Sequence, residues 1–186
     1  MDDAPVEMVV ESVRVHMLSS RHVVILKEAD RERYLPIWIG PWEASAIAMR
    51  LQGLTPERPL THDLFATTLE VADVQVSRIV ISALAEETFH ARLFVIRDGQ
   101  EHEVDARPSD ALALAIRTGA PIFAALDVLD QAGLGADGGI GEDGEIGEVL
   151  ESTGERQVDP RLDVFREFVN SLEPEPDAGA EGGRTS

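Results

Sequence analysis

The chain has 186 residues, a formal net charge of −19 and no cysteine. Its length suits one domain with a hydrophobic core plus an appendage, and the absence of cysteine excludes disulfides, thiolate metal sites and a cysteine nucleophile. No apolar run approaches the roughly 20 residues that a membrane-spanning helix needs, and the acidic start MDDAPVEMVV lacks the basic region of a secretory signal. We therefore expect a cytoplasmic protein without a membrane partner.

The negative charge is concentrated toward the carboxyl end. Residues 1–132 carry 21 acidic and 12 basic side chains, whereas residues 133–186 carry 14 and 4. Lys27 is the only lysine, and the chain has no basic run. Proteins that bind duplex DNA by neutralising its phosphates usually present a basic face. Any binding of anions must therefore depend on a few placed arginines or on a bound cation.

Alternating apolar and polar residues predict strands in the first third of the chain. Segments 6–18 and 22–28 alternate in this way and are joined by a tight turn at residues 19–21. Segment 33–39 is expected to be a third strand. Pro36 favours an edge position or a strand end for it, because proline cannot donate a ladder hydrogen bond.

Helical spacing then replaces the alternation. Residues 40–53 predict a helix in which Pro41 suits the first turn and Gly53 the stop. Residues 58–72 predict a second helix with Thr61 as its N-cap.

The second half returns to strands before two more helices. The segments VQVSRIVISAL, TFHARLFVIRD and EHEVDA predict three strands, and Asp98-Gly99 predicts a hairpin turn between the last two. A largely apolar helix over 108–118 ends at Gly119, and a short helix is expected near 126–132. This order predicts an α+β fold, with a mostly antiparallel sheet covered by helices, in a single compact domain.

Composition divides the chain into four parts. Residues 1–132 form the expected domain, and residues 133–158 are an acidic, glycine-rich linker. Residues 159–172 have the spacing of an amphipathic helix, and residues 173–186 are expected to be a disordered tail. Because such a helix is marginal alone in water, we expect it to dock on the domain or on a partner.

Three expected helix starts share one pattern, in which a proline precedes a carboxylate of the first helical turn. The carboxylates are Glu43, Asp63 and Asp110. Acids at this position accept hydrogen bonds from free N–H groups and interact favourably with the helix dipole, for about 0.3–1 kcal/mol each. For each carboxylate taken alone, this structural role is the favoured interpretation.

The neighbouring residues support a second interpretation, which requires the helix starts to converge. Arg58 and Arg107 lie just outside helices, where a guanidinium can hold a phosphate through two hydrogen bonds. His62 is a candidate proton carrier near neutral pH. The candidate substrate-binding residues are Arg58, Arg107 and Ser109, and the candidate catalytic residues are His62, Asp63, Asp105 and Arg107.

The same carboxylates are candidate ligands for a divalent cation. Mg²⁺ and Mn²⁺ prefer carboxylate oxygens. A bound cation would provide the positive charge that the chain lacks, polarise a phosphoryl oxygen and activate water. The candidate metal ligands are Glu43, Asp63, Asp105 and Asp110. The sequence contains no HExxH, no Walker loop and no Gly-x-Ser-x-Gly.

The two tryptophans give a less specific signal. Trp38 and Trp42 lie on either side of Gly40-Pro41. Because indole rings bury much apolar area, we favour packing in the core or in an interface over a platform for stacking bases.

Four stretches resemble the bifunctional nuclease family in their order and spacing: YLPIWIGPWEASAIAMRLQG, RPLTHDLFATTLE, FHARLFV and VDARPSDALALAIRTGAPIF. The resemblance covers roughly residues 6–132, and the closing VFREFVNSLEP is similar to the short helical end of actinobacterial-type members. It implies a compact α+β domain that tends to form a dimer and that cleaves both DNA and RNA. It assigns no catalytic residues.

The acidic charge and this resemblance conflict, because a chain without a basic face binds duplex nucleic acid poorly. A metal-dependent site that acts on short or single-stranded substrates reconciles them. One alternative is a regulatory module that binds a small anionic ligand at its arginine-flanked helix starts. Another is an interaction module that uses the acidic carboxyl-terminal segment. The apolar helix 108–118 needs cover on both flanks, which favours a symmetric homodimer.

Overall fold

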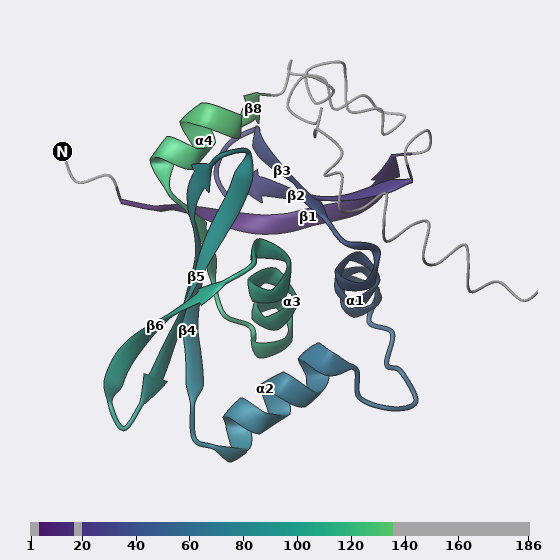
Figure 1. The fold of residues 1–186 in the computed structure, drawn as a ribbon, viewed down its shortest axis with the longest axis vertical. Helices are drawn as coiled ribbons and strands as arrows, with labels where there is room; N and C mark the ends of the chain where they lie inside the picture. The colour runs from purple at the N-terminus through teal and green to yellow at the C-terminus, as the bar shows by residue number, and fades with distance from the viewer. Residues whose placement is uncertain (1–3, 17–19, 136–186) are drawn as a thin grey trace, which may run out of the picture. The chain divides into compact units, whose positions relative to one another are not determined.

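The computed structural model describes residues 4–16 and 20–135, in which it contains eight strands and four helices (Figure 1). In chain order they are β1 (Val6–His16), β2 (Arg21–Glu28), β3 (Arg33–Ile39), α1 (Pro41–Leu51), α2 (Thr61–Val71), β4 (Gln75–Ala85), β5 (Thr88–Arg97), β6 (Gln100–Ala106), α3 (Pro108–Thr118), β7 (Ile122–Ala124), α4 (Leu126–Ala132) and β8 (Leu134–Gly135). The helix expected over 159–172 and the tail lie outside the described residues. None of the helices in the described part of the chain has the length and apolarity that a membrane crossing requires.

All eight described strands belong to one sheet, in the order β6-β5-β4-β7-β1-β2-β3-β8. Neighbouring strands are antiparallel except for the parallel pair β4 and β7. The short strand β7 therefore joins two antiparallel halves, β1-β2-β3 and β4-β5-β6. The predicted α+β fold with a mostly antiparallel sheet is confirmed.

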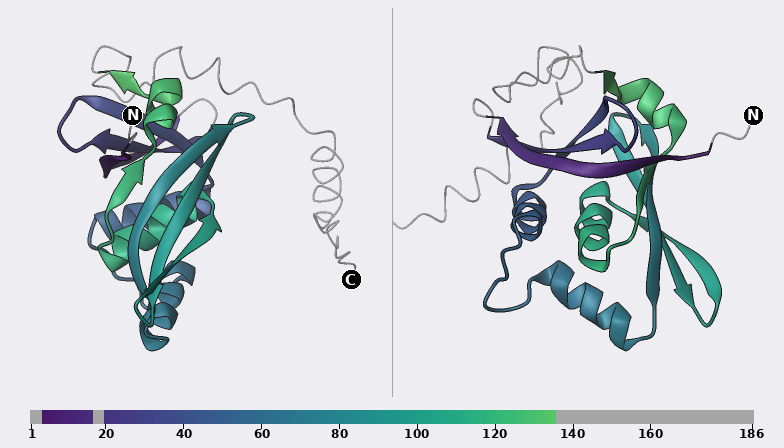
Figure 2. Two further views of the ribbon diagram at one scale, coloured as in Figure 1. Left: turned by 90° about the vertical axis from the view of Figure 1, so that its left-hand side faces the viewer. Right: turned by 180° about the vertical axis from the view of Figure 1, so that it is seen from behind.

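The two halves of the sheet meet at a large angle, and α3 lies in the corner between them (Figure 1). Figure 2 shows the same corner from two other sides, with α1 and α2 next to α3. Residues 111–115 of α3 are each at most 2% exposed, and the helix packs against α1, α2, β4 and β5. Five consecutive buried residues need cover from more than one side. The same chain provides that cover, so the burial of α3 gives no reason for a second subunit.

Strand patterns explain how the sheet supports this core. Ala91, Leu93 and Val95 alternate along β5 and face the helices. Pro36 lies within β3, and the outer side of that strand pairs only at Arg33 and Tyr34 among the described residues. Proline therefore occupies a partly open edge, as its missing N–H predicts.

The start of α2 differs from its prediction. The helix begins at Thr61, with Leu60 at the N-cap, so the assignment of Thr61 as the cap is wrong. The N–H of Leu60 donates instead to Oδ2 of Asp63 at 2.9 Å. A carboxylate at the third helical position thus accepts from the N–H of the N-cap residue, as the acid of a capping box does.

The two tryptophans have different environments. Trp38 is half-buried, and the guanidinium carbon of Arg21 lies 4.2 Å from its ring centre. Trp42 is 84% exposed, so of the two packing environments predicted for it the core is excluded. An indole in the first turn of a helix points outward here because the neighbouring Ala44, Ala46 and Ile47 make up the buried face of α1.

Candidate functional site

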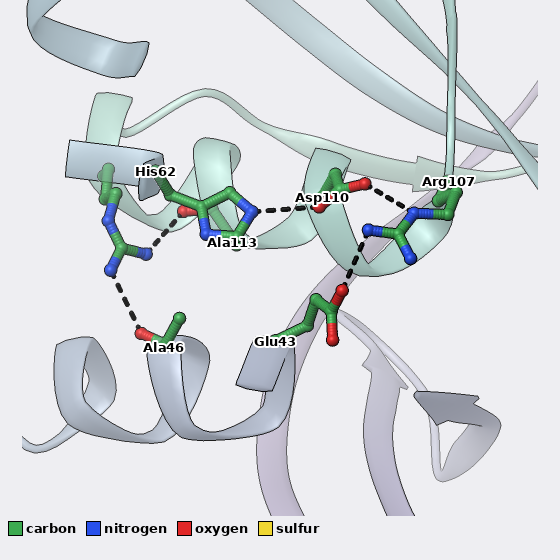
Figure 3. A network of polar contacts seen from close by, with 7 residues as sticks. Glu43, Ala46, His62, Arg107, Asp110 and Ala113 are labelled. Carbon is green, nitrogen blue, oxygen red and sulfur yellow. Dashed lines mark hydrogen bonds and ion pairs between the residues drawn. The ribbon is translucent and has the colours of Figure 1, made fainter. Parts of the chain in front are cut away.

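The first turns of α1, α2 and α3 converge on one side of the domain, as the site hypothesis requires. Arg107, at the N-cap of α3, links two of them (Figure 3). Its Nη2 donates to Oε1 of Glu43 on α1 at 2.8 Å, and its Nε donates to Oδ2 of Asp110 on α3 at 2.8 Å. The structure therefore brings two of the predicted carboxylates to one guanidinium.

His62 of α2 completes this group. Its Nε2 lies 3.0 Å from Oδ1 of Asp110 (Figure 3), and its side chain is 13% exposed. We call Glu43, His62, Arg107 and Asp110 the helix-start cluster. Asp110 bridges the cluster, since one of its oxygens contacts the imidazole and the other contacts the guanidinium.

Local sequence explains why these side chains are available. Pro41 and Pro108 occupy the first positions of α1 and α3, and neither helix has a side-chain hydrogen bond at its N-cap. Gly40 lies at the N-cap of α1, and the carboxylate of Glu43 occupies the space that a Cβ at this position would need. The first-turn acids are therefore positioned to bind Arg107 in addition to interacting with the helix dipoles.

The cluster is charged and partly open to solvent. Burial of Asp110 acts to raise its pKa, but hydrogen bonds from Arg107 and His62 outweigh it and hold the pKa below the usual value. The hydrogen bond to Asp110 and the negative charge of Asp110, together with the hydrogen bond to Glu43, raise the pKa of Arg107. The Glu43 side chain is 17% exposed and that of Arg107 is 67% exposed. A guanidinium so open to solvent can reach an incoming anion.

A second arginine connects the same three helices by hydrogen bonds. Arg117 of α3 donates through Nε to Oδ1 of Asp63 on α2 at 2.6 Å. Its Nη1 donates to the carbonyl of Ala113 at 2.8 Å, and its Nη2 to the carbonyl of Ala46 on α1 at 3.2 Å. Figure 3 shows the positions of Ala46 and Ala113 beside the cluster. The Arg117 side chain is only 5% exposed, so these hydrogen bonds form a buried polar network that links α1, α2 and α3.

Sequence reasoning missed Arg117, although a signal existed. It is the only charged residue after Asp110 in an otherwise apolar helix. A cation in a helix that is buried on several sides needs acceptors from its neighbours. Asp63 is one of these acceptors, and it also lines an open groove of about 690 Å³ between α2, the end of α3 and the start of β4.

The model of the bifunctional nuclease domain matches residues 24–137. The chain belongs to this family.

Relatives of this family member fall into two groups. An uncharacterized protein of Mycobacterium tuberculosis is 39% identical over 169 residues, which are 91% of this chain and 96% of the relative. A protein of Oryza sativa subsp. japonica named bifunctional nuclease 1 is 25% identical over 114 residues, which are 59% of this chain and 34% of the rice protein. A protein of Oryza minuta named bifunctional nuclease gives the same values.

Not all candidate residues of this nuclease-family domain lie in the cluster. Asp105 of β6 is 72% exposed, and its Oδ1 lies 3.2 Å from Nη1 of Arg92 on β5. Arg58 is exposed in the connection before α2, and Ser109 is 6% exposed in the first turn of α3. Asp63 is held by Arg117 rather than by Arg107.

The carboxylates of the cluster are candidate ligands for a divalent cation. Within residues 4–16 and 20–135, no three His, Asp or Glu side chains gather closely enough to hold a metal by themselves. Glu43 and Asp110 nevertheless share one guanidinium. Mg²⁺ commonly keeps several waters and binds through one or two carboxylates plus substrate phosphates. Two adjacent carboxylates fit that mode of binding.

The pairing of Asp63 with Arg117 predicts acid-sensitive stability. Partial burial acts to raise the pKa of Asp63, but hydrogen bonds from Arg117 and from the Leu60 N–H lower it. Because the folded-state pKa is lowered, the contribution to stability is present above the ordinary aspartate value of about 3.9 and is lost as the pH falls through the lowered value. Asp63→Asn should cost about 1.5–3 kcal/mol of unfolding free energy at neutral pH, and the deficit should shrink in acid.

Urea denaturation of parent and variant at about pH 7 and about pH 3 measures this difference. Glu101→Gln is the matched control, since Glu101 also pairs with an arginine, Arg78, but on the exposed face of the sheet. This control should cost little stability at either pH. A deficit of Asp63→Asn that is the same at both pH values contradicts the prediction.

Proposed function

We propose that the chain is a nuclease that cleaves phosphodiester bonds of DNA, RNA or both at the helix-start cluster. Membership in the bifunctional nuclease domain family supports a nuclease role in general. The observation that carries the proposal is the convergence of Glu43, His62, Arg107 and Asp110 from three helices. Phosphodiester cleavage needs a group that binds the phosphate and a group that moves a proton, and this cluster supplies both.

Arg107 is the proposed phosphate ligand. Its planar guanidinium can donate two parallel hydrogen bonds to phosphate oxygens, and its exposure leaves it accessible. A substrate phosphate competes with Glu43 and Asp110 for this guanidinium. Binding is therefore favoured when another positive charge offsets the two carboxylates.

His62 is the proposed proton carrier. Donation from its Nε2 to Asp110 fixes the orientation of the ring and leaves Nδ1 as the acceptor, as a carboxylate does for a base in other hydrolases. His62 would take a proton from attacking water or give one to the leaving oxygen. Asp110 stabilises the protonated ring by its charge.

Glu43 and Asp110 are the proposed ligands of Mg²⁺ or Mn²⁺. When bound, the cation would polarise a phosphoryl oxygen and lower the pKa of a bound water. The two carboxylates would hold it, and Arg107 would become free to bind the phosphate. A site that also used Asp63 or Asp105 would require these side chains to leave Arg117 and Arg92.

Substitutions in the cluster test the cleavage proposal. His62→Ala should lower kcat by about 10²- to 10⁴-fold, because it removes the proton carrier. Arg107→Lys should raise KM, because an ammonium cannot reproduce a bidentate contact. The measurement is steady-state cleavage of a labelled single strand, with folding checked by circular dichroism.

Glu103→Gln is the control, since Glu103 pairs with Arg92 on the sheet and not with a residue of the helix-start cluster. Its rate should stay near that of the parent. Parent-like cleavage by His62→Ala would overturn the proposed site. Phosphate binding without any cleavage would favour a regulatory module for a small anionic ligand.

Metal removal tests the cation separately. EDTA should abolish cleavage and added Mg²⁺ or Mn²⁺ should restore it. Glu43→Gln and Asp110→Asn should need higher metal concentrations, because each removes one ligand charge. Gly40→Ala should act in the same direction, since its Cβ would displace the Glu43 carboxylate without removing a charge. Undiminished parent cleavage in EDTA excludes the metal.

We also propose that two copies associate through the outer face of α2. Leu64, Phe65 and Val71 are 62%, 46% and 80% exposed, and α2 has no buried residue. With Thr68, these positions form an uncharged stripe of helical spacing. On a chain of charge −19, an uncharged stripe lets two copies meet about a two-fold axis without opposing like charges.

Light scattering at increasing protein concentration measures this association. The parent should have the mass of a dimer, and Val71→Glu should shift it to a monomer. Val104→Glu is the matched control, because Val104 is also exposed, at 45%, but lies on β6. A parent chain that stays monomeric at high micromolar concentration rejects this interface.

A further inference from the structure

Trp42 presents a large aromatic surface to solvent beside the helix-start cluster. It is 84% exposed, and its neighbours Pro41 and Ser45 are exposed as well. It belongs to the first turn of α1, which Pro41 initiates, so the backbone that carries the indole is well defined. An exposed tryptophan that no described element covers is unusual enough to require an explanation.

The position of Trp42 relates it to the exposed guanidinium. Glu43 is the next residue, and its Oε1 lies 2.8 Å from Nη2 of Arg107. Consecutive residues of a helix lie about 1.5 Å apart along the axis and about 100° apart around it. The backbone position of Trp42 therefore adjoins that of the residue that binds the guanidinium, and the indole leaves the helix about 100° around its axis from Glu43.

We propose that Trp42 stacks on an unpaired nucleobase of the strand whose phosphate Arg107 binds. The substrate class is then single-stranded DNA or RNA, or an unpaired end. This inference rests on the proposed function, because it takes Arg107 as the phosphate ligand. Aromatic side chains stack on any base whose face is free, whereas the bases of a duplex are already stacked on each other.

Charge favours this substrate class over duplex. A protein of net charge −19 cannot obtain affinity from many phosphate contacts. Stacking on an indole does not depend on a positive surface, so it adds affinity for a nucleic-acid strand that the negative net charge does not provide. The surroundings also favour a nucleotide over a second copy of the chain. Trp42 is next to an acid that binds an arginine, whereas the apolar residues of α2 form a separate uncharged stripe.

Intrinsic fluorescence can report on Trp42 directly. The chain has only two tryptophans, and Trp38 is half-buried beneath Arg21. The full chain is titrated in Mg²⁺, in a His62→Ala background that slows cleavage and leaves the proposed metal ligands in place, with a single-stranded oligothymidylate, with a duplex of mixed sequence and with inorganic phosphate. Parent protein, Trp42→Ala, Trp42→Phe and the control Trp38→Phe are compared.

The single strand should quench the parent and Trp38→Phe but leave the fluorescence of Trp42→Ala unchanged. Its Kd, measured independently by anisotropy of a labelled strand, should rise on the order of 10-fold or more in Trp42→Ala. Trp42→Phe should recover part of the loss, since a smaller ring still stacks. The duplex should bind more weakly than the single strand, and the affinity for phosphate should be the same in all four proteins.

Other outcomes overturn the inference. Equal strand affinity of Trp42→Ala and the parent removes the stacking role. A Trp42 signal that changes with protein concentration alone, and not with the strand, assigns the indole to contact between copies. The stacking role and the nuclease role can fail separately. Cleavage with an unchanged KM in Trp42→Ala contradicts the stacking role alone. Trp42-dependent binding of the strand, without cleavage by the protein in the presence of any metal, contradicts the nuclease role alone.

Discussion

One buried cation holds the three helices of the candidate site together. Arg117 donates hydrogen bonds to acceptors on α1, α2 and α3 from a side chain that is 5% exposed. Helix α2 has no fully buried residue, and only Ala66 and Leu69 pack partly buried against the core, so apolar packing holds it weakly. A buried guanidinium that loses its acceptors is strongly destabilising, so the polar network contributes to the position of α2 together with these apolar contacts. The contact of His62 with Asp110 depends on that position, so the geometry of the helix-start cluster depends in part on Arg117.

The second constraint is charge. Arg78 and Arg92 face acids of β6 across the sheet, so the exposed surface of β4-β5-β6 offers little net positive field. The cluster itself contains two carboxylates and one guanidinium, and it is negative overall when His62 is neutral. Neither this part of the sheet nor the cluster therefore offers long-range attraction to a polyanion, and the proposed recognition of a strand is local. A carboxylate pair, an exposed guanidinium and an exposed indole are three short-range means of recognition that remain effective on an acidic protein.

Sequence patterns predicted most elements of this fold, because local rules govern them. Alternation located the strands, prolines located the starts of α1 and α3, and Gly119, with a φ of 73°, ended α3 as expected. The patterns could not show which helix starts meet. Glu43 and Asp110 are far apart in sequence, and only the packing of α1 against α3 brings them together. Arg117 was missed for the same reason, since its acceptors lie on other elements. The core environment predicted for Trp42 was wrong, because residue type indicates how much area a side chain can bury, not whether its helix turns that side chain inward.

The short strand β7 has a consequence for synthesis of the chain. Ile122 lies opposite Met8 of β1 on one side and opposite Ile79 of β4 on the other. Among the described strands, only β8 is made later, so the hairpin of β1 and β2 keeps an open edge while about a hundred further residues are translated. At roughly 5–20 residues per second this lasts on the order of 5–20 s. An open strand edge is a template for pairing with other chains. The nascent protein is thus vulnerable to misassembly throughout this interval, and slow translation upstream of residue 122 prolongs it.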